Sequence, residues 1–229
     1  DYTWGAMEDT TMSVFHEDIP PPAHLAEETM PQSIVCHELV HQWFGDLITM
    51  KSWGHLWLNE GFASYLDPMY FEHSRGRDWF EYRLEDDLEG YFSEAASDYR
   101  RAIVTHRFAD PEELFDGHAY PKAMAVVHML RRDLGEKAWR KGLANYVKRF
   151  AGKTAETYDL KVAFEEATGR CLDGFVEQWL MSRGHPELKC SFEPNSKLGI
   201  GVLTVEQTQD KKSNLEVFTF DLDVDLMDK

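Results

Sequence analysis

Five consecutive residues, His37-Glu38-Leu39-Val40-His41, place two histidines four positions apart in the sequence. On an α-helix, positions i and i+4 lie one above the other on the same face, so both imidazoles can bind one metal ion. Glu38 directly follows the first histidine, where its carboxylate can act on a water molecule that the metal binds. The pattern H-E-x-x-H on a helix is typical of zinc hydrolases, and its two histidines need a third protein ligand.

The third ligand is available in the stretch Trp57-Leu58-Asn59-Glu60-Gly61-Phe62-Ala63. Glu60 follows His41 after 18 intervening residues, near the start of a helix predicted over about residues 59–73. Two antiparallel helices joined by a short link can bring this carboxylate to the histidine pair. We therefore predict that His37, His41 and Glu60 bind one zinc ion per chain, because a His₂Glu set with one open position is a catalytic arrangement. The competing interpretation, two solvated histidines on a helix surface, loses most of its weight once Glu60 is included.

These ligands predict hydrolysis of an amide bond. Bound zinc lowers the pKa of its water toward neutrality and polarises a carbonyl group. Glu38 can take the proton from that water and later pass it to the leaving amine. The tetrahedral oxyanion formed on the way needs a second stabilising group besides zinc.

The overall composition excludes several classes of protein. The 229 residues can bury a sizeable core, as one domain or as one large domain with a small one. A net charge of −17 without a basic stripe argues against a nucleic-acid partner and weakly favours cationic substrates. No apolar run approaches the length of about 18 residues that a membrane span needs, and no stretch resembles a signal peptide. We therefore expect no membrane association and a cytoplasmic location.

Two further features of the sequence concern its first residue and its cysteines. The chain opens at Asp1 without an initiating Met, which indicates a segment of a longer protein whose N-terminus could carry a targeting signal. Its three cysteines are too few and too scattered for a disulfide framework, and Cys36 is interpreted as a small buried residue.

The pattern of apolar residues predicts a mainly helical α+β protein. One or two strands are expected over residues 2–15, and a loop at residues 20–22. A helix is expected from about Glu27 to Gly45, with Ile34, His37, His41 and Phe44 on one face. Residues 97–120 look irregular, and a β-hairpin is predicted from residues 201–205 and 217–222. The remaining helices are predicted at about 59–73, 78–96, 121–135, 136–150, 156–168 and 172–183.

Four separated motifs resemble those of one known family. H-E-x-x-H followed by Glu60 within Trp57–Ala63 is similar to the aminopeptidase N-like zinc metallopeptidases, which include the leukotriene-epoxide hydrolases. Gly5-Ala6-Met7-Glu8-Asp9 resembles their exopeptidase motif, usually Gly-Ala-Met-Glu-Asn, with Asp9 in place of the Asn. Tyr120-Pro121-Lys122 resembles their Tyr-x-Lys motif. The resemblance extends over about residues 4–190.

The resemblance implies a fold and a set of roles. The fold would be a thermolysin-like catalytic domain over residues 1–190 with a partial β-sheet at its N-terminal side, followed by the truncated start of a small β-domain at 191–229. The family's N-terminal β-domain and C-terminal helical domain would be missing. Glu8 would grip the free α-ammonium of the substrate, and the backbone of Gly5, Ala6 and Met7 would hold the peptide like an added strand. Tyr120 would support the oxyanion, held off helical geometry by Pro121 just before a helix.

The expected function is that of a zinc aminopeptidase acting on peptides with a free N-terminus. An endopeptidase with the same zinc site is one alternative, and it would lack an amine anchor. An epoxide hydrolase of the same family is a second alternative, and it would need a deep lipid channel. A non-enzymatic binding scaffold is a third alternative. It predicts that the zinc ligands have been lost, whereas His37, His41 and Glu60 are all present. The segment could also be inactive without its flanking domains.

Overall fold

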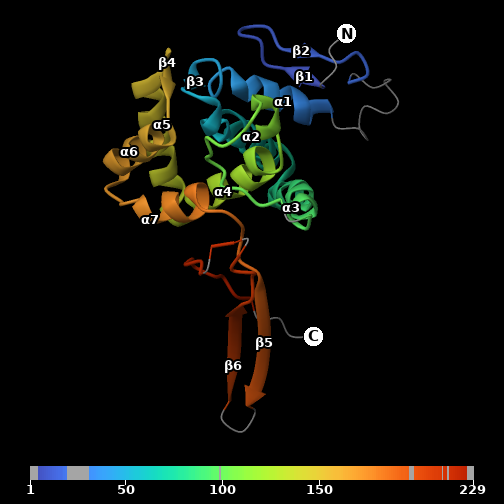
Figure 1. The fold of residues 1–229 in the computed structure, drawn as a ribbon, viewed down its shortest axis with the longest axis vertical. Helices are drawn as coiled ribbons and strands as arrows, with labels where there is room; N and C mark the ends of the chain where they lie inside the picture. Colours follow the sequence, from blue (N-terminus) through green and yellow to red (C-terminus); the bar gives the residue numbers. More distant parts are fainter. Residues whose placement is uncertain are drawn as a thin grey trace.

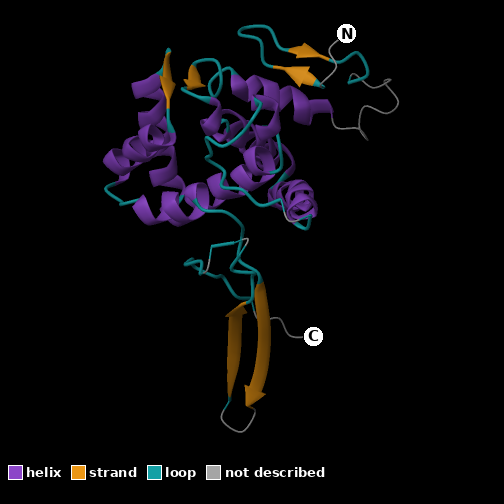
Figure 2. Ribbon diagram, viewed as in Figure 1, coloured by secondary structure: helices purple, strands orange, loops and turns teal. Residues whose placement is uncertain are grey.

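A computed structural model describes residues 5–19, 31–97, 99–195, 199–212, 214–215 and 217–225. The helices form one body, short strands lie at its margins, and a two-stranded hairpin extends from one side (Figures 1 and 2). The protein is therefore mainly helical with few short strands, as the sequence predicts. The loop predicted at residues 20–22 and the helix start predicted at residues 27–30 lie outside the described residues.

The helices agree closely with the predicted ranges. In the described part of the chain they are α1 (Pro31–His41), α2 (Trp57–Arg75), α3 (Arg77–Ala95), α4 (Ala123–Leu134), α5 (Glu136–Phe150), α6 (Thr157–Thr168) and α7 (Asp173–Val176). Shorter helical turns are η1 (Trp53–His55), η2 (Pro111–Leu114), η3 (His118–Lys122) and η4 (Glu177–Met181). None of the helices in these ranges is both long enough and apolar enough to cross a membrane.

The helix that carries both histidines ends earlier than predicted. The prediction that it runs to Gly45 and includes Phe44 was wrong, because α1 ends at His41 and turns follow. Gly45 has a φ of 142°, which no helix contains and which residues with a side chain rarely adopt. The chain therefore reverses direction soon after His41 and enters β3 (Ile48–Met50).

The strands form three two-stranded sheets within the described residues. β1 (Ala6–Met7) pairs antiparallel with β2 (Val14–Phe15), which confirms strands near the N-terminus. β3 pairs in parallel with β4 (Lys153–Ala155), a strand that the sequence did not suggest. β5 (Leu188–Asn195) pairs antiparallel with β6 (Ile200–Gln207).

The predicted hairpin of residues 201–205 and 217–222 was wrong in its second strand. β6 pairs with the segment before it, and Gly199 at a φ of 65° lies just before β6. Residues 217–222 instead return to the helical body, where Thr219 exchanges two hydrogen bonds with the Gln178 side chain, at 2.7 and 2.9 Å. Phe218 is buried and stacks on Trp179 with ring centroids 5.3 Å apart. The alternating apolar residues of this segment therefore serve packing rather than strand pairing.

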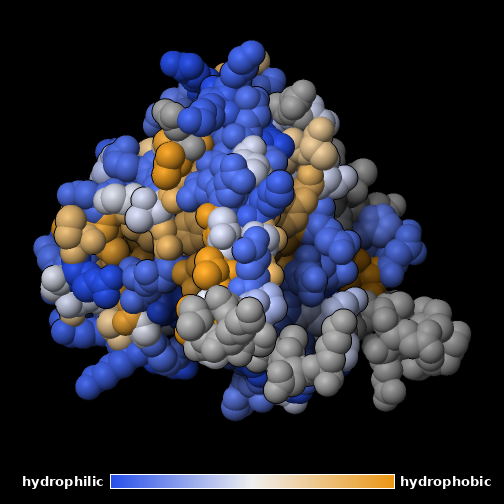
Figure 3. All heavy atoms as spheres, turned by 90° about the horizontal axis from the view of Figure 1, so that it is seen from below, coloured by the Kyte–Doolittle hydropathy of each residue, from blue (hydrophilic) through white to orange (hydrophobic). Residues whose placement is uncertain are grey.

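The hairpin extends away from the helices (Figure 1). Seen from the side on which it extends, the surface is mostly hydrophilic, with apolar areas near the centre of the view (Figure 3). Apolar side chains of the hairpin, among them Phe192, Ile200 and Val202, are exposed. β5 crosses residue 190, and the division into domains at residues 1–190 and 191–229 stays a prediction.

The core is aromatic and is centred on α2, which packs against α1, α3 and α4. Phe62 of α2 is fully buried and stacks on Phe44, with ring centroids 4.7 Å apart, and on Trp139 at 6.2 Å. Tyr65, one turn later, meets Trp139 edge-on at 6.1 Å. Buried aromatic side chains remove large apolar areas from water, so this cluster fixes α2 against its neighbours. Cys36, by contrast, is only partly buried, which corrects its interpretation as a buried residue.

Two helical glycines test the packing of α5 against α6. A Cβ added at Gly142 in α5 would lie 2.3 Å from the Phe164 ring, so we expect Gly142→Ala to lower the free energy of unfolding by about 1–3 kcal/mol. Gly90 in α3 is the matched control, since among the described residues no atom lies within 4 Å of its added Cβ. Gly90→Ala should raise the free energy of unfolding by up to about 1 kcal/mol through helix propensity. Urea denaturation measures both, and equal effects would contradict the observed packing.

Candidate active site

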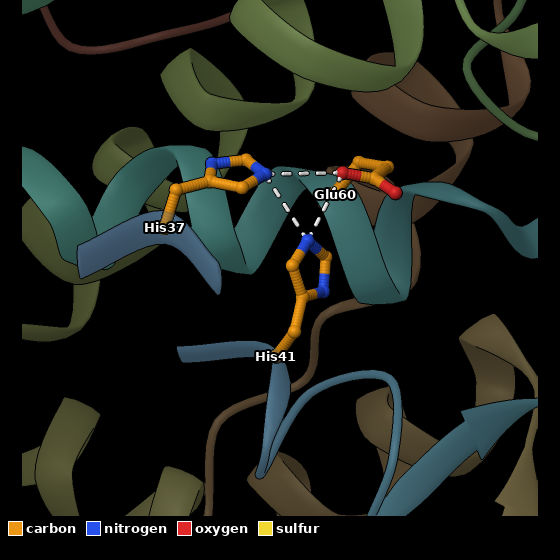
Figure 4. Close-up of side chains that lie close together, drawn as sticks. All are labelled: His37, His41 and Glu60. Atoms are coloured by element: carbon orange, nitrogen blue, oxygen red, sulfur yellow. Dashed lines mark hydrogen bonds and ion pairs between the residues drawn. The ribbon is translucent and has the colours of Figure 1, made fainter. Parts of the chain in front are cut away.

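Side chains from α1 and α2 meet at one point (Figure 4). His37 and His41, one turn apart on α1, have their Nε2 atoms 3.1 Å from each other. Glu60, in the first turn of α2, has its Oε2 3.4 Å from the Nε2 of His37 and 3.3 Å from that of His41. The three predicted ligands thus come together, each with one donor atom directed at the same point.

The turn after α1 determines which nitrogen of His41 faces this cluster. Nδ1 of His41 donates a hydrogen bond to the backbone oxygen of Phe44 at 2.9 Å, because a carbonyl oxygen can only accept. In a neutral His41 the lone pair is then on Nε2. Gly45 leaves room for this arrangement, since a Cβ there would lie 3.1 Å from Nδ1. Hydrogen bonds of this kind orient metal-binding histidines in many proteins.

The donor set fits a zinc ion. The Nε2 lone pair of His41 and the carboxylate of Glu60 are both hydrogen-bond acceptors, so their separation of 3.3 Å requires a proton or a metal cation between them. Both side chains are buried, and a buried carboxylate is costly unless a positive charge compensates it. Two imidazole nitrogens and one carboxylate oxygen are ligands that zinc binds in catalytic sites.

The electrostatics of the cluster favour positive charge. Burial alone would favour the neutral form of Glu60, but hydrogen bonds from His37 and His41 outweigh it and hold the pKa of this carboxyl well below its ordinary value. Burial also opposes a charged His41, yet its hydrogen bond to Glu60 and the Glu60 charge raise the pKa of His41 to about 9. The same negative charge would attract a divalent cation to this point.

Two more carboxylates face the cluster from different elements. Glu38 is buried on α1, and burial raises the pKa of its carboxyl, with Glu8 and Glu60 adding to the effect while the two histidines oppose it. Glu8 directly follows β1, and its Oε1 lies 3.8 Å from Nδ1 of His41. One side-chain atom from each of Glu8, Glu38 and His41 lies within 4.8 Å of the other two. The predicted base and the predicted amine anchor are therefore neighbours.

Glu8 is held over α1 by the hairpin of β1 and β2. The backbone oxygen of Gly5 accepts a hydrogen bond from the backbone N of His16 at 2.7 Å, which extends the pairing of the two strands. In the loop between them, the backbone N of Thr11 donates to Oε1 of Gln42 at 2.9 Å. Gln42 directly follows α1, so this bond ties the hairpin to the helix that carries the histidines. Asp9, which departs from the resembled motif, is exposed.

Tyr120 approaches from within a helical turn. The prediction that Pro121 holds Tyr120 off helical geometry before a helix was wrong, because the π-helical turn η3 contains both residues. Pro121 has no N–H to donate, and the backbone N of Lys122 donates to the oxygen of Gly117 at 3.0 Å, five residues earlier. Single π-turns of this kind are frequent at functional sites.

The phenol of Tyr120 lies beside the ligand cluster. Its ring is nearly parallel to that of His37, with centroids 6.2 Å apart and an interplanar angle of 13°. Burial, together with the negative charge of Glu60, holds the pKa of Tyr120 well above its ordinary value, so the phenol keeps its proton. A close contact between α2 and α4 allows this approach, since a Cβ at Gly61 would lie 2.7 Å from that of Ala123.

A cleft of about 670 Å³ opens beside these residues. Its lining includes Ala6, His37, Glu38 and Tyr120. Sequence reasoning missed two other lining residues, Ser64 and Asp67, and Asp67 accepts a hydrogen bond from Ser33 at 2.5 Å. Their positions at i+4 and i+7 from Glu60 place them on the same face of α2, and that spacing is the signal that could have identified them.

The chain is similar in sequence to known aminopeptidases. The family described as Peptidase family M1 domain matches residues 1–179. Aminopeptidase M1-A of Oryza sativa subsp. japonica is 33% identical over 223 residues, which cover 94% of this chain and 25% of that protein. Glutamyl aminopeptidase of Sus scrofa is 32% identical over 198 residues, which cover 82% of this chain and 21% of that protein. The chain thus spans about a quarter of the length of the curated relatives it matches.

Solved structures show the same likeness. The M1 zinc metallopeptidase of Deinococcus radiodurans bound to a Tyr-Ser-Ala substrate aligns with a TM-score of 0.61 and 27% identity, covering 78% of this chain and 37% of that one. Aminopeptidase A of Legionella pneumophila in complex with aspartic acid aligns with a TM-score of 0.72 over 89% of this chain and 23% of that one, and at 23% identity it shows the fold alone. Because the family match covers residues 1–179 of 229, this chain belongs to peptidase family M1.

Proposed function

We propose that this chain carries the catalytic centre of a zinc-dependent aminopeptidase that hydrolyses the N-terminal peptide bond of peptides. The observation that carries the proposal is the meeting of His37, His41 and Glu60 at one point, with the carboxylates of Glu38 and Glu8 beside His41 and a cleft lined by His37 and Glu38. The names of the relatives support it, since they are aminopeptidases. The metallopeptidase from Deinococcus radiodurans was solved with a tripeptide substrate, which supports peptides as the substrate class.

In this proposal His37, His41 and Glu60 hold one zinc ion. When bound, zinc would supply a Lewis acid that polarises the scissile carbonyl and makes water more acidic. The carbonyl of Phe44 accepts a hydrogen bond from Nδ1 of His41, which leaves Nε2 free to bind the metal. Hydrogen bonding of this kind reduces the reorganisation that binding requires.

The other residues move protons and hold the substrate. Glu38 accepts a proton from water and passes it to the leaving amine, since its carboxylate lies beside the ligand cluster. The protonated phenol of Tyr120 donates a hydrogen bond to the developing oxyanion. Glu8 binds the free α-ammonium through a charge-assisted hydrogen bond. In the described structure β1 pairs with β2 alone, so the substrate backbone can lie along the other edge of Gly5, Ala6 and Met7.

The proposal extends to the architecture. Residues 1–190 would form a thermolysin-like catalytic domain, and residues from 191 would begin a separate β-domain. The first part is supported by the adjacency of α1, which carries H-E-x-x-H, and α2, which carries Glu60. The second is supported by the hairpin of β5 and β6, which extends away from the helices (Figure 1).

The variant Glu8→Gln tests the hypothesis that this chain acts as an aminopeptidase. The unchanged chain, loaded with zinc, is expected to cleave a peptide with a free N-terminus and to leave its acetylated twin intact. Since hydrogen bonds to charged groups contribute about 1.5–3 kcal/mol, Glu8→Gln should lower kcat/KM for the free peptide by about 10- to 100-fold. Glu17→Gln, at an exposed acid of the same segment, is the matched control and should change little. Equal cleavage of the free and acetylated peptides by the unchanged chain would favour an endopeptidase instead.

A further inference from the structure

A buried charged network lies behind Tyr120. Its centre is the ion pair of Arg101 and Asp116, whose side chains are 12% and 8% exposed. Nε of Arg101 donates to Oδ2 of Asp116 at 2.7 Å, and Nη2 donates to Oδ1 at 2.6 Å. This two-point contact fixes the orientation of both groups, which a single charge contact does not do.

Asp116 also holds the start of the turn that carries Tyr120. Its Oδ1 accepts hydrogen bonds from the backbone N of His118 at 2.9 Å and of Ala119 at 3.1 Å. Its backbone oxygen accepts from the backbone N of Tyr120 at 3.3 Å. One residue therefore binds the N–H groups of three successive residues of η3. Pro121 has no N–H to contribute, so these bonds, together with that of Lys122 to Gly117, define the shape of the turn.

Arg101 is anchored in turn by backbone groups from separate segments. Nη1 donates to the backbone oxygens of Ala102 and Ile103, both at 2.8 Å, and Nη2 donates to that of Leu114 at 3.2 Å. The burial of this guanidinium is thus compensated by a carboxylate and by three carbonyl groups. Asp116 is therefore held by a side chain that is itself bound to three backbone oxygens, and it links that side chain to η3.

Three residues of this region are of types that can bind a metal, and they lie close together. Glu94, Asp116 and His118 bring one possible ligand atom each within 4.8 Å of the others. The backbone N of Arg101, however, donates to Nε2 of His118 at 3.2 Å, so that Nε2 must be the acceptor. In a neutral His118 the proton is then on Nδ1, which lies 3.2 Å from Glu94 and 3.4 Å from Asp116 without forming a hydrogen bond to either. A nitrogen that carries a proton cannot bind a metal. We therefore do not interpret Glu94, Asp116 and His118 as a metal site.

We propose that the pair of Asp116 and Arg101 positions Tyr120 for the reaction proposed above, on which this inference rests. Neither residue touches the substrate; they act through the shape of η3. The phenol must meet an oxyanion within a fraction of an ångström, and a displacement of about 1 Å can cost about 100-fold in rate. Asp116 binds the backbone of the turn directly, so its loss should displace the phenol while leaving His37, His41 and Glu60 in place.

Single variants of the zinc-loaded full chain provide the first measurement. Asp116→Ala is expected to lower kcat by about 10- to 100-fold with KM and zinc content nearly unchanged. Asp116→Asn keeps an oxygen acceptor for the two N–H groups but loses the charge and the Oδ2 acceptor that face Arg101, so its effect on kcat should be smaller than that of Asp116→Ala. Glu72→Gln is the matched control, since it removes a partly buried carboxylate bound to Arg131 at 3.0 Å, and its kcat should equal that of the unchanged chain. An unchanged kcat in Asp116→Ala would overturn the proposal.

A double variant distinguishes positioning from general structural damage. If Asp116 acts through Tyr120, adding Asp116→Ala to Tyr120→Phe should cost little beyond Tyr120→Phe alone. If the fold-losses in kcat of the two single variants instead multiply in the double variant, the positioning role is overturned. If Tyr120→Phe itself keeps full activity, the role proposed for Tyr120 in the reaction is wrong. If Tyr120→Phe is impaired while Asp116→Ala is not, only the positioning inference is wrong.

Ligand binding supplies a readout that does not depend on turnover. Calorimetry should show that Asp116→Ala weakens a phosphinic dipeptide, which mimics the tetrahedral state, more than it weakens a free amino acid. Equal weakening of both ligands would contradict the proposal. Arg101→Lys keeps the charge but not the two-point contact, and it replaces Asp116→Ala if that variant does not fold. Its expected result is the same selective loss of kcat and of phosphinate binding.

Discussion

Replacing Glu38 by glutamine is expected to lower kcat by about 10²- to 10⁴-fold, the usual contribution of a general base. Glutamine has nearly the shape of glutamate but cannot accept a proton at neutral pH. Glu38 is buried beside the candidate zinc ligands without belonging to the triad of His37, His41 and Glu60. The variant should therefore keep its zinc and its fold while losing turnover.

Three measurements make this result decisive. Elemental analysis should give the same zinc content per chain before and after the substitution, and thermal unfolding should show an intact fold. Steady-state cleavage of a peptide with a free N-terminus then gives kcat. Glu85→Gln makes the same chemical change at an exposed position of α3 and should leave all three unchanged. A Glu38→Gln chain that still turns over at the original rate would assign the base to another group.

The meeting of the three candidate zinc ligands could be predicted because their geometry is local. The spacing of His37 and His41 fixes their common face on any α-helix, whatever surrounds it. The prediction of Glu60 as the third ligand required only that a second helix should run beside the first. A short link between two helices makes that arrangement favourable. The structure brings these three side chains together from α1 and α2, which pack against each other.

The supporting groups could not be predicted because they depend on contacts that the sequence does not specify. The carbonyl of Phe44 meets His41 only because α1 ends at His41, and the apolar spacing placed Phe44 on the same helix. The π-turn around Tyr120 follows from hydrogen bonds to Asp116 and Gly117, and proline alone suggested an extended residue before a helix. In both cases a local propensity gave the wrong boundary by a few residues.

The sheet pairings illustrate a longer-range limit. β3 and β4 are three residues each and lie about a hundred residues apart in sequence, so neither segment indicates its partner. Residues 217–222 alternate in polarity as a strand would, yet they bind Gln178 and bury Phe218 against Trp179. Alternation shows that a segment has two faces, and it does not say which neighbour will cover one of them.

Replacing Glu60 by glutamine should remove the zinc that Glu38→Gln keeps, and the comparison of these two variants tests the whole site. Both substitutions neutralise a buried carboxylate of similar size, and the two carboxylates lie near the same histidines. Only Glu60 has an oxygen facing both Nε2 atoms, at 3.4 and 3.3 Å, so only its loss should lower zinc affinity.

The free energy of unfolding, measured with and without added zinc, quantifies this difference in zinc affinity. A ligand that binds only the folded chain raises the free energy of unfolding by about 4 kcal/mol when its concentration is 1,000 times its Kd. The unchanged chain and Glu38→Gln should both show such a rise and lose it with a chelator, whereas Glu60→Gln should show little rise at the same zinc concentration. Equal rises in the two variants would mean that Glu60 is not a ligand, and the histidine pair would then need a different third partner. A rise lost in both would place Glu38 in the coordination sphere, where it could not also serve as the base.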